Sequence, residues 1–186
     1  MSNHGQDSSL MQIPPSLLAA IQTAVAAERN DAEAAMLFRQ AGLATGGAVH
    51  DAFRAWLASS GTIVSAPEDL ASEEFWKRLG DFFEQMGWGR LEYDSPHPGI
   101  IELSSADWAE GSGGATGRPT CHLSTGIIAE LLRRIAGEDL AVLEVECRSA
   151  GADRCRFLIG AAPTLEALFG HLQDGAGYAE AVQSLS

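Results

Sequence analysis

The strongest constraint on the fold of this chain comes from three cysteines and one glutamate, Cys121, Glu144, Cys147 and Cys155, whose spacing is typical of one zinc site. Zinc in proteins prefers four tetrahedral ligands drawn from thiolate, imidazole and carboxylate, and a set supplied entirely by the protein is structural rather than catalytic. Residues that share one ion must lie together in the fold, although here they are far apart along the chain. The alternative is three unrelated cysteines, because free cysteine is often buried as a small apolar side chain.

These three cysteines are the whole cysteine content of the chain. With an odd number of cysteines and no secretory signal, a disulfide scaffold is not expected, and a reducing compartment leaves the thiols available as ligands. No stretch approaches the roughly 18 consecutive apolar residues of a membrane-spanning helix. We therefore expect a cytoplasmic protein with no membrane span.

The charge of the chain limits its partners. The formal net charge is -13 at pH 7. Nucleic-acid phosphates and anionic membranes are bound by clustered Lys and Arg. We therefore expect no direct nucleic-acid partner.

The first third of the chain has helical periodicity. Residues 1–12 lack periodicity and are predicted to be a flexible leader. Apolar residues recur at helical spacing over about 14–29 and 32–58. Gly42 and Gly46 lie inside the second helix, and this four-residue step suggests close approach of a neighbouring backbone. A break of the helix near Gly46 is the alternative.

The period of the sequence changes after a third helix. Residues 61–67 are predicted to be a linker, and the third helix follows over about 72–86. The alternating runs 88–93 and 100–103 are then predicted to form a β-hairpin, because residues 95–99 have the composition of a turn.

Helix and strand patterns alternate in the second half. The remaining predicted elements are an exposed, mobile glycine-rich loop over 111–117, a helix over 120–135, strands over 140–148 and 155–159, and a helix over 164–172. Thr120 is expected to cap the helix that follows it. Helices thus come first, and an antiparallel sheet with a helix packed on it follows, which predicts an α+β fold.

Length and composition indicate one domain. The chain has 186 residues, of which 46% are hydrophobic, enough to form a core without the metal. We expect a single ligand-binding domain over 13–172, made of N-terminal helices over 13–60 and an α+β core over 68–160, and a polar tail over 173–186.

The stretch that contains the four candidate ligands resembles the 4-vinyl reductase domain. It reads CHLSTGIIAELLRRIAGEDLAVLEVECRSAGADRCRFLIG, and its specific part is Glu-x-x-Cys followed by the segment from Cys147 to Phe157. The domain belongs to a superfamily that also contains haem-based nitric-oxide sensors and TRAPP subunits. The glycine-bearing helix RQAGLATGGAV is similar to the N-terminal helical part of the family, so the resemblance spans roughly 15–165. It implies a helical layer packed on a small antiparallel sheet.

The resemblance implies a structural zinc ion, since the metal positions of the zinc-binding sensors in this family fall one for one on the four residues named above. Cys121 lies in the first turn of its predicted helix, where the helix dipole favours a thiolate. Glu144 and Cys147 are three apart and would point to opposite faces of an unbroken strand, so the site requires a bulge or strand end just before Cys147. His122 and Glu146 are the alternative ligands.

The resemblance also implies an apolar pocket between the helical layer and the sheet. Domains of this family bind small molecules, as in phenol-responsive transcription activators, or are associated with vinyl reduction in bacteriochlorophyll synthesis. Candidate lining residues are Trp76, Phe83, Trp88, His97, Trp108, Ile128 and Leu131. Trp108, before the glycine-rich loop, is the better candidate for a pocket or lid. For the aromatic residues at helical spacing, core packing is the alternative, and for His97 it is an exposed turn.

Catalytic signatures are weak in this sequence. A Ser-His-Asp triad cannot be assembled from the spacing, and a Rossmann fingerprint is absent, so we expect no enzyme. We expect a sensor or carrier that binds a small hydrophobic or aromatic molecule, holds structural zinc and forms a homodimer through its helices. The first alternative is an accessory factor for vinyl reduction of a tetrapyrrole in (bacterio)chlorophyll biosynthesis. The second is a TRAPP-like adaptor with a vestigial pocket.

Overall fold

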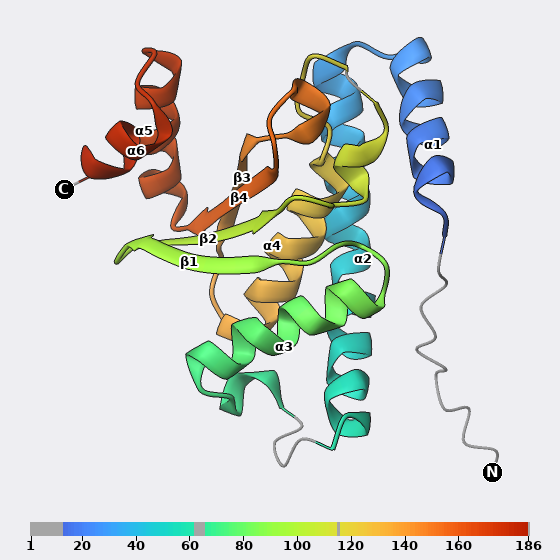
Figure 1. Ribbon diagram of the computed structural model, residues 1–186, viewed down its shortest axis with the longest axis vertical. Coiled ribbons are helices and arrows are strands. Elements are labelled where there is room, and N and C mark those ends of the chain that lie inside the picture. Colours follow the sequence, from blue (N-terminus) through green and yellow to red (C-terminus); the bar gives the residue numbers. More distant parts are fainter. Residues whose placement is uncertain (1–12, 62–65, 115, 186) are drawn as a thin grey trace.

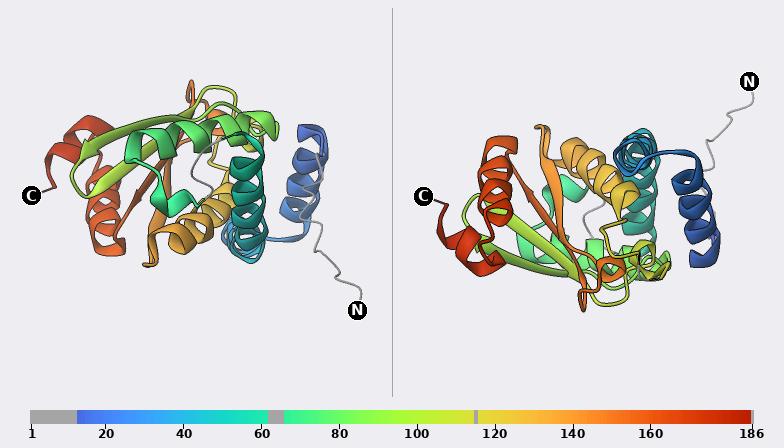
Figure 2. Two further views of the ribbon diagram at one scale, coloured as in Figure 1. Left: turned by 90° about the horizontal axis from the view of Figure 1, so that it is seen from below. Right: turned by 90° about the horizontal axis from the view of Figure 1, so that it is seen from above.

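A four-stranded antiparallel sheet lies at the centre of the structure, with helices on both of its faces (Figures 1 and 2). The computed structural model describes residues 13–61, 66–114 and 116–185, so the predicted leader and most of the predicted linker lie outside the described residues. The elements are α1 (Pro15–Glu28), α2 (Asp31–Ser59), η1 (Pro67–Asp69), α3 (Ser72–Gln85), β1 (Glu92–His97), β2 (Ile100–Ser105), η2 (Glu110–Ser112), α4 (His122–Ala136), β3 (Ala141–Glu146), η3 (Arg148–Ala150), β4 (Cys155–Gly160), α5 (Ala162–Gln173) and α6 (Tyr178–Gln183). The strand order is β1-β2-β4-β3, and the predicted α+β class is confirmed.

The long helix α2 crosses α4 in backbone contact. It begins after Asn30, whose side chain accepts a hydrogen bond from the backbone N–H of Glu33 at 3.0 Å. A Cβ added to Gly42 would overlap the α4 backbone, and one added to Gly126 would overlap the α2 backbone. The helix continues through Gly46 to its end. The expected close approach is therefore confirmed, and the alternative of a broken helix is wrong.

The central strand β4 shows why the sheet needs helices on both faces. Successive side chains of a strand point to opposite faces. Phe157 and Ile159 belong to the main core, which lies between the sheet and α2, α3 and α4. Leu158 lies on the other face, in a second cluster with α5 and α6. The unbroken apolar run of this strand follows from burial on both sides.

The segment predicted as a polar tail instead contains α6, packed on the outer face of the sheet. Ala181 and Val182 are buried there. The Tyr178 hydroxyl donates a hydrogen bond to the Glu102 carboxylate at 2.5 Å, and Arg156 donates to the same carboxylate at 2.9 Å. The Arg156 guanidinium also lies 4.4 Å from the centre of the Tyr178 ring. The prediction failed because the apolar contacts of α6 are with residues far away in sequence.

The first strand begins at Glu92, later than the predicted start at Trp88. Gly87 and Gly89 have φ values of 78° and 123°, which L side chains rarely adopt. The carbonyl of Trp88 accepts a hydrogen bond from the N–H of Ala109 at 2.7 Å. The chain therefore makes a tight turn between α3 and β1, and this turn fixes the indole of Trp88 beside α4.

Helix α1 lies at the edge of the molecule, beside α2 (Figures 1 and 2). Leu18 is its buried residue, while Leu17 and Ile21 are 44% and 43% exposed. Among the described residues, no helix is both long and apolar enough to cross a membrane.

Candidate metal centre and ligand cavity

Four elements bring the predicted metal ligands together. Cys121 is the N-cap residue of α4, Glu144 lies on β3, Cys147 precedes η3, and Cys155 begins β4. One ligand atom from each lies within 4.8 Å of all the others. All three cysteines are free and buried. The structure thus converges these residues in a geometry that can hold one metal ion.

A β-bulge solves the orientation problem at Glu144 and Cys147. Glu144 pairs with Phe157 and Glu146 with Arg156, so two steps on β3 correspond to one step on β4. The extra residue shifts the alternation of side chains along the strand. The bulge required by the sequence analysis is therefore present.

The distances within the cluster fit a tetrahedral zinc site. The Cys121 sulfur lies 3.7 Å from that of Cys147 and 3.6 Å from that of Cys155. Zinc–sulfur bonds of about 2.3 Å place two sulfurs of a tetrahedron about 3.8 Å apart, whereas a disulfide needs about 2.05 Å. The Glu144 Oε2 atom accepts a hydrogen bond from the Cys121 N–H at 3.1 Å. Its Oε1 atom is buried and has no partner among the described residues, as expected of an atom that binds a cation.

The ionisation of the cluster also calls for a cation. The pKa of Cys147 is lowered because the thiols of Cys121 and Cys155 hydrogen-bond to it. The pKa of Cys121 is raised, chiefly because of its hydrogen bond to Cys147. Burial, followed by the charge of Cys147, raises the pKa of Glu144 to about 9. Four buried anionic ligands cannot all ionise together, and a bound metal ion would replace the protons that they retain.

The alternative ligands do not belong to this cluster. The Glu146 carboxylate accepts a hydrogen bond from Arg156 at 3.0 Å. His122 does not belong to the group of residues whose ligand atoms converge. Glu144 is therefore the carboxylate that the geometry supports.

Two residues that the sequence analysis did not identify support the cluster. A Cβ on Gly111 would collide with the Cys155 sulfur, so this position requires glycine. Gly111 is buried, which corrects the prediction of an exposed loop. The Ser149 hydroxyl lies 2.9 Å from the Cys147 sulfur and donates a hydrogen bond to the carbonyl of Arg118 at 2.8 Å. Neither residue has a signal in the sequence, because both act through distant neighbours.

The start of α4 is capped by a buried glutamate rather than by Thr120. The Glu110 carboxylate accepts hydrogen bonds from the backbone N–H groups of Leu123 and Ser124, at 2.9 and 2.7 Å, and from the Ser124 hydroxyl. Burial raises its pKa to about 7, against the opposing effect of these hydrogen bonds. The Thr120 hydroxyl instead donates to Ser149 at 2.9 Å. The predicted cap is wrong because the neighbouring η3 turn offers a competing acceptor.

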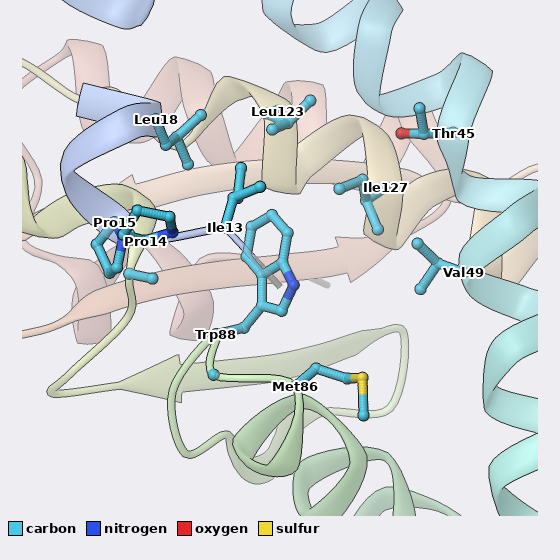
Figure 3. A pocket seen from close by; sticks show the side chains of 12 residues that line it. Ile13, Pro14, Pro15, Leu18, Thr45, Val49, Met86, Trp88, Leu123 and Ile127 are labelled. Carbon is cyan, nitrogen blue, oxygen red and sulfur yellow. The ribbon is translucent and has the colours of Figure 1, made fainter. Parts of the chain in front are cut away.

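An apolar cavity of about 230 Å³ lies between α1, α2, the start of α4 and the turn at Trp88 (Figure 3). It is lined by Ile13, Pro14, Pro15, Leu18, Thr45, Val49, Met86, Gly87, Trp88, Ala109, Leu123 and Ile127. None of these residues is charged. The Thr45 hydroxyl already donates a hydrogen bond to the carbonyl of Ala41 at 2.9 Å. The cavity is therefore suited to a neutral, mainly apolar molecule.

Of the seven predicted lining residues, the structure places Trp88 at this cavity. Five others are packed in the main core: Trp76, Phe83, Trp108, Ile128 and Leu131. His97 ends strand β1, where its ring accepts a hydrogen bond from the Gly99 N–H at 3.1 Å. Trp108 is 1% exposed, and its indole N–H donates to the Ser124 hydroxyl at 2.8 Å. Sequence periodicity could not separate the cavity from the core, because both bury apolar side chains.

Comparison with solved structures defines the class of fold. The phenol-responsive sensory domain of the transcription activator PoxR, solved with phenol, is 16% identical with a TM-score of 0.64, over 90% of this chain and 84% of that chain. A vinyl-4-reductase family protein from Methanocaldococcus jannaschii is 19% identical with a TM-score of 0.50, over 81% and 83%. Trafficking protein particle complex subunit 3 from Naegleria fowleri, covalently bound to palmitic acid, is 12% identical with a TM-score of 0.57, over 78% and 93%. These likenesses show a shared fold.

The family follows from the sequence itself. Residues 106–161 match the family model of the 4-vinyl reductase domain. The chain therefore carries this domain, and the resemblance drawn from its cysteine-bearing segment is confirmed. The matched segment contains all four candidate metal ligands. No curated protein sequence matches the chain.

Proposed function

We propose that this chain is a sensor or carrier of the 4-vinyl reductase type that binds a small hydrophobic or aromatic molecule and holds a structural zinc ion. The observation that carries the binding function is the uncharged cavity of about 230 Å³ beside Trp88. A cavity of about 150 Å³ lined by apolar side chains is large enough for benzene. The ligand proposed here is therefore a neutral molecule of one or two rings. The phenol bound by the structurally similar PoxR domain is consistent with this class.

The proposed zinc ion has a structural role. Three thiolates and one carboxylate fill all four tetrahedral positions, so no position is open for substrate or water. The ligands come from the start of α4, from β3 and from β4. The ion would therefore fix the helix to the sheet, and the proposed function contains no catalytic step.

A second candidate function is an adaptor with a vestigial pocket. It is favoured by the core position of Trp76, Phe83 and Trp108, which fill the space between the helices and the sheet with their own side chains. The accessory role in tetrapyrrole reduction has less support, because a tetrapyrrole macrocycle is several times larger than a molecule that fits the cavity. An adaptor would differ from a sensor by failing to bind any small apolar molecule.

Titration with phenol and naphthalene, followed by tryptophan emission, tests the binding function, because Trp88 forms part of the cavity wall. We expect saturable binding of at least one of the two compounds. Val49→Phe places a larger side chain in the cavity and should abolish this binding. Leu43→Phe, at an exposed position of the same helix, is the matched control and should bind as the wild type does. Absence of binding in the wild type would favour the adaptor.

A further inference from the structure

Helix α1 is the wall of the cavity with the weakest attachment to the rest of the domain. Leu18 is the one residue of α1 that is fully buried. The remaining anchor is polar, because the Gln22 side-chain amide donates hydrogen bonds to the carbonyl of Thr120 at 3.1 Å and to Glu110 at 3.3 Å. No ion pair is formed by α1 in the part of the chain that the structure describes.

A molecule in the cavity must touch both α1 and the body of the domain. The segment from Ile13 to Leu18 supplies one side of the cavity. Leu123 and Ile127 of α4, together with Trp88, supply the other side. Figure 3 shows the side chains of these residues directed into a common space. The α1 wall and the body thus meet across the cavity rather than in direct close packing.

The cavity and the polar anchor of α1 lead to the same place, the start of α4. Glu110 accepts a hydrogen bond from Gln22 of α1 and also caps α4 at Leu123 and Ser124. Leu123 lines the cavity as well. A change in the position of α1 therefore acts directly on the first turn of α4.

We propose that α1 is the part of this domain that responds to ligand: a neutral apolar molecule in the cavity holds α1 against α4 and the Trp88 turn, and its loss releases the helix. This inference rests on the proposed binding function of the cavity. A ligand stabilises the docked state because it contacts both sides, and these contacts are lost when α1 detaches. In turn, the apparent affinity falls in proportion to the fraction of molecules with α1 docked. Release of α1 would be the signal to a partner.

Amide hydrogen exchange of the full chain, with and without saturating naphthalene, tests this proposal. We expect naphthalene to slow exchange in α1 several-fold and to leave α5, on the other side of the sheet, unchanged. Gln22→Ala removes the polar anchor without altering the cavity lining. It should speed α1 exchange in the free protein and weaken naphthalene binding about fivefold, the effect expected for one hydrogen bond. Thr23→Ala, at an exposed position of the same helix, is the matched control and should change neither quantity.

The outcomes separate the two levels of the proposal. If naphthalene binds but α1 exchange is unchanged, and Gln22→Ala binds as tightly as the wild type, the response of α1 is refuted while the binding function stands. If neither naphthalene nor phenol binds, the binding function fails, and the response of α1 fails with it.

Discussion

At the scale of single residues, the site depends on buried carboxyl groups with unusual surroundings. Glu144 has one oxygen hydrogen-bonded to Cys121 and the other without a partner among the described residues. Glu110 accepts hydrogen bonds from α1 and α4 while almost entirely shielded from water. Such groups cost free energy unless a cation or hydrogen bonds compensate for burial. Each therefore permits a test in which the sign of the effect is informative.

Replacement of Glu144 distinguishes a metal site from a metal-free cluster. If zinc binds, Glu144→Gln removes an anionic ligand, and we expect at least tenfold weaker zinc binding and a lower melting temperature. If no metal binds, the same change removes a poorly solvated carboxyl group and should be neutral or stabilising. Native mass spectrometry and thermal unfolding measure both quantities. Glu138→Gln, at an exposed position, is the matched control.

The raised pKa of Glu110 predicts a pH-dependent stability. The pKa rises from 4.5 to about 7 on folding, so the folded chain holds this proton more tightly than the unfolded chain does. The free energy of unfolding of the wild type, relative to Glu110→Gln, should therefore fall between pH 5 and pH 8, by up to about 3 kcal/mol. Urea unfolding of both proteins, saturated with zinc, measures the difference. An increase with pH would show that the hydrogen bonds outweigh burial.

At the scale of secondary structure, the crossing of α2 and α4 organises the domain. It brings the candidate ligand Cys121 and the cavity residues Leu123 and Ile127 to their positions, because all three lie at the start of α4. Gly42 and Gly126 permit the close contact of the two backbones. This contact leaves no space for a side chain at either position.

Substitution at the helix crossing should be strongly destabilising. Gly126→Ala places a Cβ against the backbone of α2, and we expect a loss of about 3 kcal/mol in the free energy of unfolding, the upper range for overpacking. Gly170→Ala, inside α5 with no atom near the added Cβ, should instead stabilise by about 0.5–1 kcal/mol. Urea unfolding of both variants makes the comparison. Equal effects would contradict the close helix contact.

At the scale of the whole molecule, the helical face remote from the sheet is unusually apolar. Exposed apolar side chains on α1 and α2 are Leu17, Ile21, Met36, Leu37 and Leu43. Apolar surface of this kind is typical of an interaction site. We therefore propose that the homodimer expected from the sequence forms through these helices.

The dimer proposal predicts a position-specific effect of charge. Ile21→Asp places a charge on the proposed interface and should convert the dimer to a monomer. Phe169→Asp introduces the same charge at an apolar residue with similar exposure, 44% against 43%, on α5. It should leave the dimer intact. Light scattering coupled to size-exclusion chromatography measures the mass, and a monomeric wild type would refute the proposal.

Local patterns in the sequence determined much of the fold. The helical spacing over α2, α3 and α4 and the alternation in β3 are properties of short segments, so their existence could be predicted. The four metal ligands were also identified, because tetrahedral zinc requires a particular set of residue types and the resemblance to the 4-vinyl reductase domain gives their order. The required bulge before Cys147 followed from strand geometry alone.

Tertiary contacts decided the rest. Whether Trp88 or Trp108 lines the cavity depends on which neighbours fill the space around each indole, and those neighbours come from other elements. Glu110 caps α4 and Gly111 borders Cys155 because the chain folds back on itself there. Burial and hydrogen-bond partners are properties of three-dimensional packing, and a linear pattern specifies only which side chains are able to take part.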